Sequence, residues 1–116
     1  MRRTGEAARL LADAGVVAIA SLVSPYAVDR DAVRAAHEGD GLEFLEVFVD
    51  TPVDECARRD PKGLYARARA GELPDFTGVS APYEAPERPE LRLAAEDVDA
   101  AVERAWALLV ARGVVG

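Results

Sequence analysis

The stretch VVAIASLV, residues 16–23, decides the fold class that this sequence predicts. It is apolar at nearly every position and rich in β-branched residues, which is typical of a strand covered on both faces in a parallel sheet. A helical pattern precedes it, with Thr4 as the expected N-cap and Gly15 as the expected C-terminal stop. A short polar helix is predicted at 29–37. This alternation predicts an α/β fold.

The rest of the chain continues the alternation. The further predicted elements are a strand at 42–50, helices at 53–59 and 64–70, a short strand at 90–93 and a closing helix at 96–112. We find no internal repeat and no linker that would divide the chain. All 116 residues are therefore expected to form one domain.

Composition limits the partners and the compartment. The formal net charge of -7 argues against general affinity for nucleic acid or for an anionic membrane. No segment reaches the roughly 20 apolar residues of a membrane span. Cys56 is the only cysteine, so neither an intrachain disulfide nor a thiolate zinc cluster is available. We expect a cytoplasmic protein without nucleic-acid or membrane partners.

Residues 60–89 are rich in proline and glycine and predict a mobile lid and substrate loop. Within it, Lys62 beside Gly63 offers a mobile ammonium group and open backbone to a phosphate or sulfate oxygen. A solvated surface lysine is the alternative. Phe76 follows Asp75 in a polar loop, where an aromatic ring can stack on a base, although it can equally anchor the loop.

Three other residues stand where chemistry is common. Ser24 follows the first predicted strand, at the sheet edge where α/β proteins bind ligands, although a serine there often only ends the strand. Asp50 ends the second strand and has two readings, a water-mediated magnesium contact or the favoured role of capping the next turn. His37 is alone near a helix end, which favours a surface or dipole-compensating role over metal binding.

Several blocks of sequence resemble adenylylsulfate kinases, in the same order along almost the whole chain. They are RRTGEAARLLADAG, LVSPYAVDRDAVR, FLEVFVDTP, CARRDPKGLYARARAGE, DFTG and PYEAPERPEL. The resemblance implies a three-layer, parallel-sheet P-loop kinase fold. It also implies that ATP and Mg²⁺ are used to phosphorylate the 3'-hydroxyl of adenosine 5'-phosphosulfate in sulfate assimilation, which gives 3'-phosphoadenosine 5'-phosphosulfate.

The resemblance also implies the residues that bind the sulfated nucleotide. Val23 and Ser24 would contact it, Lys62 would approach its charged end, and Asp75 with Phe76 would hold the adenine. Ser24 matches the family's proposed phosphoserine position and is the one catalytic candidate. Because positioning and charge neutralisation supply most of the catalysis in phosphoryl transfer, we interpret Ser24 first as a binding residue.

Arg59 and Ala95 match the region that encloses ATP in the family, and no metal ligand is assigned. The departure from the family pattern is large, because the 116 residues contain no GxxxxGK[ST] phosphate-binding loop. The resemblance therefore implies an N-terminally truncated kinase fold, and we expect no turnover from this chain alone.

The alternative hypothesis is a non-catalytic remnant that binds an adenine nucleotide or pairs with a complete kinase subunit. A homodimer and association with a sulfate adenylyltransferase are further expected partnerships.

Overall fold

Helices and strands alternate along the chain in the computed structural model, which describes residues 1–51, 53–59, 62–72, 77, 82–94 and 97–115. The elements are α1 (Arg2–Asp13), α2 (Ala27–Gly39), β1 (Val47–Asp50), α3 (Val53–Arg59), α4 (Leu64–Arg69), β2 (Leu91–Ala94) and α5 (Val98–Ala111). The predicted helices at 53–59 and 64–70 and the predicted strand at 90–93 are confirmed within one residue. The helix predicted at 29–37 is longer at both ends.

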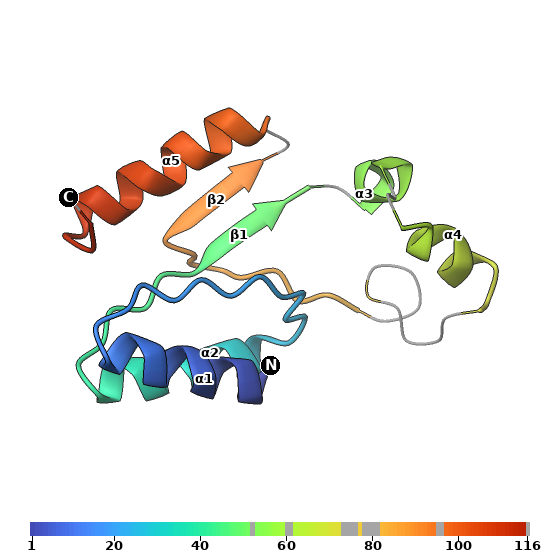
Figure 1. Ribbon diagram of the computed structural model, residues 1–116. Coiled ribbons are helices and arrows are strands. Elements are labelled where there is room, and N and C mark those ends of the chain that lie inside the picture. The colour runs from blue at the N-terminus through green and yellow to red at the C-terminus, as the bar shows by residue number, and fades with distance from the viewer. Residues whose placement is uncertain (52, 60–61, 73–76, 78–81, 95–96, 116) are drawn as a thin grey trace.

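The described sheet consists of β1 and β2, which pair in parallel with Val47 opposite Leu91 and Asp50 opposite Ala94. Helix α5 lies on one side of this pair, and α1 and α2 lie on the other side (Figure 1). Helices α3 and α4 lie beyond the carboxyl ends of the strands (Figure 1). The predicted α/β class is confirmed.

The prediction of a strand at 16–23 was wrong. The segment runs as an extended stretch in the same direction as β1, but it forms no strand in the described part of the chain (Figure 1). A groove of about 780 Å³ is lined by residues 16–24, by residues 42–47 and Val49, and by side chains of α1, α2 and α5. An apolar, β-branched sequence favours a strand, but a strand also needs a neighbouring backbone to pair with. In the described part of the chain, residues 16–23 border the groove and pair with no strand.

The second predicted strand is shorter than the expected 42–50, because β1 begins at Val47. Residue Leu91, the first of β2, pairs with Val47 and donates its amide to the carbonyl of Glu46 at 3.2 Å. The two glutamates that interrupt the apolar pattern form ion pairs instead, Glu43 with Arg112 at 2.9 Å and Glu46 with Arg30 at 3.4 Å. The residues before Val47 are therefore held by side chains.

Helix ends follow local chemistry in two of three cases. Gly15 adopts φ +91°, the left-handed conformation expected after α1. The Asp97 carboxylate accepts the amide of Ala100 at 2.8 Å and so caps α5. The predicted cap at Thr4 was wrong, because α1 begins at Arg2 and Met1 is its N-cap.

Helices α1 and α2 pack through a close contact at Gly5, which is buried. A Cβ atom at this position would lie 2.7 Å from Cγ2 and 2.9 Å from Cγ1 of Val33. Valine is β-branched and has one strongly preferred rotamer in a helix, so turning its side chain away costs free energy. The absence of a side chain at Gly5 therefore sets how closely the two helices approach.

Arg34 of α2 joins this helix to Glu46, just before β1, and to Glu90, just before β2. Arg34 holds both carboxylate oxygens of Glu90, at 2.6 and 3.1 Å, and the same carboxylate accepts the amide of Glu46 at 2.6 Å. Burial works against the charge of Glu90, but the hydrogen bonds from Arg34 and from the Glu46 amide outweigh it and hold the pKa of Glu90 below its ordinary value.

His37 also belongs to this interior, and its predicted surface position was wrong. The residue is 5% exposed, its Nδ1 lies 2.8 Å from the carbonyl oxygen of Val33, and its ring meets Phe44 edge-on at 5.1 Å. It lies in the last turn of α2, where a dipole-compensating role was expected. The apolar face of the ring explains the burial.

Replacing Gly5 with alanine is expected to destabilise the fold. The overpacking cost of about 1–3 kcal/mol exceeds the roughly 1 kcal/mol that alanine gains over glycine inside a helix. Gly39 in α2 is the matched control, because nothing lies within 4 Å of its added Cβ atom, so Gly39→Ala should leave stability unchanged or slightly higher. Urea unfolding compares the two variants, and a Gly5→Ala variant as stable as the wild type would contradict the packing described above.

Replacing Glu90 with glutamine is expected to lower the free energy of unfolding by about 1–3 kcal/mol at pH 7, because it removes a charged, partly buried hydrogen-bonding partner. Since the folded pKa of Glu90 is lowered, its contribution is present above the unfolded carboxylate pKa of about 4.3 and is lost as the pH falls through the folded pKa. Urea titrations from pH 7 downward should show the two proteins converging in acid.

The control for this pH experiment is Glu38→Gln, because Glu38 lies 3.7 Å from Arg34 but its side chain is 59% exposed. It should change stability by less than about 0.5 kcal/mol at any pH. A Glu90→Gln deficit that stays constant with pH would rule out the ionic contribution.

Candidate functional site

The first feature of the candidate site is the backbone turn at Ser24. Ser24 has φ +45° and is the one non-glycine residue with positive φ among those described. A conformation of this kind costs of order 1–3 kcal/mol and persists only where the surroundings hold it. Pro25 follows directly, and Ser24 ends the extended segment at 16–23. The turn therefore depends on the contacts described next.

Arg30 holds this turn from α2. Its Nη1 donates to the carbonyl oxygen of Ser24 at 2.5 Å, and its Nη2 donates to the carbonyl oxygen of Glu84, also at 2.5 Å. The guanidinium carbon lies 5.8 Å from the centre of the Tyr83 ring. Sequence reasoning missed Arg30, because nothing in a polar helix pattern distinguishes a buried arginine from a solvated one.

The chain at 83–84 is joined to the same turn by two more hydrogen bonds. The amide of Glu84 donates to the carbonyl of Pro25 at 2.8 Å, and the carboxylate of Glu84 accepts the amide of Ala27 at 2.8 Å. The Tyr83 ring also stacks on Phe48 of β1, with ring centres 6.2 Å apart. Residues 83–84 lie near the end of the proline- and glycine-rich segment 60–89, which is called the excursion below. They are thus fixed to the Ser24 turn and to the sheet.

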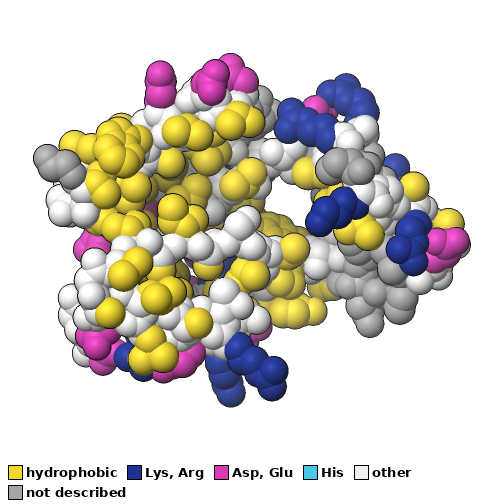
Figure 2. Space-filling model, viewed as in Figure 1, with side chains coloured by type: hydrophobic (Ala, Val, Ile, Leu, Met, Phe, Trp, Pro, Cys, Tyr) yellow, Lys and Arg dark blue, Asp and Glu magenta, His cyan; other side chains and the backbone are white. Residues whose placement is uncertain are grey.

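The residues that line the groove beside β1 include Val23, Ser24, Arg30 and Tyr83. The hollow between α5 and the helices α1 and α2 is lined mainly by hydrophobic side chains (Figure 2). Its volume of about 780 Å³ lies in the range of small-molecule sites, and such sites combine an apolar lining with a few polar groups. The structure therefore brings the predicted residues Val23 and Ser24 together in one concave surface.

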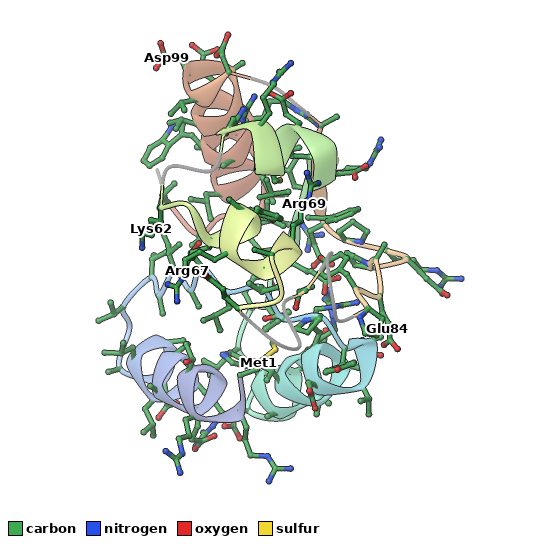
Figure 3. All side chains as sticks on the ribbon, turned by 90° about the vertical axis from the view of Figure 1, so that its right-hand side faces the viewer. Met1, Lys62, Arg67, Arg69, Glu84 and Asp99 are labelled. Carbon is green, nitrogen blue, oxygen red and sulfur yellow. The ribbon has the colours of Figure 1, made fainter. Side chains whose placement is uncertain are left out.

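Basic side chains gather at the other side of the molecule, over α3 and α4 (Figure 2). Lys62 is exposed and directly precedes Gly63, whose φ of +67° forms the turn into α4. Lys62 and Arg67 point to the same side in Figure 3. Arg67 is paired with Glu72 at 3.1 Å. This basic region has the charge expected of a surface that receives an anion.

Arg59 lines a separate cavity of about 360 Å³ between α5 and the carboxyl ends of the strands. The other lining residues are Val49, Thr51, Leu93, Val98, Ala101, Val102 and Ala105. Arg59 donates to the carboxylate of Glu55 at 2.9 Å, and Arg58 binds the same carboxylate. The hydrogen bond from Arg58 is the main reason that the pKa of Glu55 is lowered. This cavity offers one guanidinium in an otherwise mostly apolar wall.

Three of the predicted site residues, Asp75, Phe76 and Ala95, lie outside the described residues. Their predicted roles stay predictions.

The Asp50 carboxylate is bound by Arg92 of the neighbouring strand, at 2.7 Å from Nε. The partner that Asp50 has in the structure was therefore not foreseen from the sequence. Within the described ranges, no three His, Cys, Asp or Glu side chains gather as a metal site would require. None of the helices in those ranges combines the length and apolar character needed to cross a membrane.

The chain matches the family model described as adenylylsulphate kinase over residues 1–94. It is 52% identical over 96 residues to the adenylyl-sulfate kinase of Staphylococcus epidermidis, a match that covers 83% of this chain and 47% of that protein. It is also 57% identical over 116 residues to the bifunctional enzyme NodQ of Azospirillum brasilense, which covers 98% of this chain and 18% of that protein. The chain therefore spans about half the length of the adenylyl-sulfate kinase that it matches.

A solved structure supports the same relationship. The Mycobacterium tuberculosis APS kinase CysC, in complex with AMPPNP and APS, superposes with a TM-score of 0.89 at 46% identity, covering 93% of this chain and 63% of that one. With a family model that matches most of the residues and a shared α/β architecture, the chain belongs to the adenylylsulphate kinase family and has its P-loop kinase type of fold.

Proposed function

We propose that this chain forms the nucleotide-acceptor side of an adenylylsulfate kinase. In the complete reaction, the γ-phosphoryl group of ATP passes to the 3'-hydroxyl of adenosine 5'-phosphosulfate, which gives ADP and 3'-phosphoadenosine 5'-phosphosulfate. The observation that carries the proposal is the concave surface at Val23 and Ser24, within the residues that match the family. The proposed setting is sulfate assimilation in the cytoplasm, where a lone Cys56 stays reduced.

In this proposal each predicted residue has a defined part. Val23 and Ser24 contact the sulfated nucleotide in the groove, and Ser24 is also the proposed phosphoserine position. Lys62, exposed at the base of the excursion, approaches the anionic end of the nucleotide, where an ammonium group stabilises sulfate and phosphate oxygens. Asp75 and Phe76 hold the adenine, and residues 60–89 act as a mobile lid.

The donor side is supported less well by these residues. ATP would meet Arg59 and Ala95, but the cavity at Arg59 is mostly apolar and its guanidinium is already paired with Glu55. No GxxxxGK[ST] sequence occurs in the 116 residues, and the described residues gather no carboxylate set for Mg²⁺. The triphosphate and its metal do not fit the described residues by themselves, so we derive no step through them.

Exposed apolar side chains favour a second candidate, pairing with a complementary subunit. Val98, Val102, Trp106 and Val110 recur every fourth residue on α5 and are 47–76% exposed. Ile19, on the extended segment, is 85% exposed. Contiguous exposed apolar surface of this kind marks an interaction site or an aggregation hazard. A complete kinase subunit, a second copy and a sulfate adenylyltransferase are the proposed partners.

The purified chain is expected to bind adenosine 5'-phosphosulfate but not to convert it in the presence of ATP and Mg²⁺, because it encodes an acceptor surface without a phosphate-binding loop. Calorimetry measures the binding, and chromatography of the nucleotide products measures turnover. Turnover by the chain alone would contradict the inference that these residues lack a site for the triphosphate of ATP. A folded chain that binds no adenosine 5'-phosphosulfate would overturn the acceptor proposal itself. Sedimentation with and without a complete adenylylsulfate kinase tests pairing in the same samples.

Replacing Lys62 with glutamine is expected to weaken adenosine 5'-phosphosulfate binding about tenfold, which corresponds to about 1.4 kcal/mol, because a charge-assisted hydrogen bond is lost. Arg67→Gln is the matched control, since Arg67 lies in the same excursion but already pairs with Glu72. It should change the affinity less than about twofold. Calorimetry at two salt concentrations measures both, and equal losses in the two variants would indicate general electrostatic attraction and not a contact of Lys62.

A further inference from the structure

We propose that Arg30 is a positioning residue that holds Ser24 in its binding conformation and ties it to Glu84 at the end of the excursion. The inference rests on the proposed function, because it takes Ser24 as a contact of the sulfated nucleotide. Neither the sequence pattern nor the family resemblance singled out Arg30. Its evidence is the set of contacts that the guanidinium makes in the interior.

The first step is the burial of a permanent charge. Arg30 is 6% exposed, and a buried guanidinium is tolerated only where its donors are bonded and its charge is compensated. Glu46 supplies the opposite charge at 3.4 Å from Nε. The two remaining nitrogens each donate to a backbone carbonyl, one of Ser24 and one of Glu84. Each of the three guanidinium nitrogens therefore has a partner, at Glu46, Ser24 or Glu84.

The second step is the conformation of Ser24. Its φ of +45° is unfavourable for a residue with a side chain, so the surrounding contacts must over-determine it. The Arg30 donor fixes the carbonyl of this residue, and the planar fork of arginine reaches a second carbonyl at the same time. A lysine at this position keeps the charge but presents its donors from a single nitrogen, so it cannot reproduce the fork.

The third step is the reciprocal link from Glu84. Its amide donates to the carbonyl of Pro25 and its carboxylate accepts the amide of Ala27, both at 2.8 Å. Together with the Arg30 bond, three hydrogen bonds join the Ser24 turn to the residue at which the excursion returns to the body of the domain. A substitution at Glu84 is therefore expected to alter the conformation of the Ser24 turn.

Arg34 provides a control within the same helix. It lies one turn after Arg30 and shares Glu46 as an ionic partner, but its bidentate bond is to Glu90. No contact of Arg34 to Ser24 or Glu84 is found in the described part of the chain. Arg30→Lys and Arg34→Lys remove comparable guanidinium forks from one buried network, and only the first touches the turn.

The test begins with hydrogen exchange in the full 116-residue chain without ligand. In Arg30→Lys, the amides of Ala27 and Glu84 are expected to exchange at least about tenfold faster than in the wild type, because they are the donors of the two linking bonds. In Arg34→Lys they should change less than about twofold after correction for global stability. Equal acceleration in both variants, or none in Arg30→Lys, would overturn the proposal.

Calorimetry with adenosine 5'-phosphosulfate then tests the connection to the ligand. Arg30→Lys should lose about tenfold in affinity and Arg34→Lys less than twofold. Faster exchange in Arg30→Lys without a loss of affinity would refute the link to binding. If the wild type binds no ligand, the proposed function fails, while the exchange experiment still decides whether Arg30 holds the turn.

A second variant covers the case in which Arg30→Lys does not fold. Glu84→Ala removes an exposed side chain and only its bond to Ala27, so the buried network stays intact. It should accelerate exchange at Ala27 and weaken nucleotide binding, whereas Glu84→Gln, which keeps an acceptor oxygen, should restore both. An unchanged affinity in Glu84→Ala would count against the proposal.

Discussion

The described arrangement depends on the ion pairs and hydrogen bonds that two arginines of one helix, Arg30 and Arg34 of α2, make with other segments. Arg30 of α2 is buried and Arg34 is half-buried, and each charge must find acceptors because an unpaired buried charge is very costly. The acceptors come from three distant segments, at Ser24, at Glu46 and at 84–90. One helix thereby fixes the sheet, the candidate site and the end of the excursion relative to one another.

Apolar packing plays a smaller part in this arrangement. Ala68, at 5% exposure, is the one buried hydrophobic residue among those described, while many valines and leucines are exposed. A groove of about 780 Å³ lies beside β1. In the described part of the chain, the β1–β2 pairing, the ion pairs and the helix contact at Gly5 join elements that bury few apolar side chains completely. Exposed apolar surface of this kind is typical of sites that bind other polypeptides.

The candidate site combines residues with unlike origins. Val23, Ser24 and Tyr83 line the groove, and Glu84 is bonded to the turn beside it. Lys62 is not among the lining residues of the groove and lies just before α4. The proposed acceptor surface is the larger of the two hollows, about 780 Å³ against about 360 Å³ for the cavity at Arg59. The described lining of the cavity near Arg59 is mostly apolar, whereas a triphosphate is usually held by backbone amides and cationic side chains. The division between the two sides is the physical basis of the proposed function.

Much of the local structure followed from the sequence. Helical periodicity, the glycine after α1 and the alternation of helices with strands each depend on neighbouring residues, and the blocks around Ser24 and Lys62 carried the family. The tertiary structure alone decided that β1 pairs with β2 while 16–23 forms no strand, that His37 and Arg30 are buried, and that Glu84 meets the Ser24 turn. The physical reason is that periodicity and turn chemistry are short-range. Strand pairing and the burial of a charge, by contrast, depend on which distant groups are present to satisfy them.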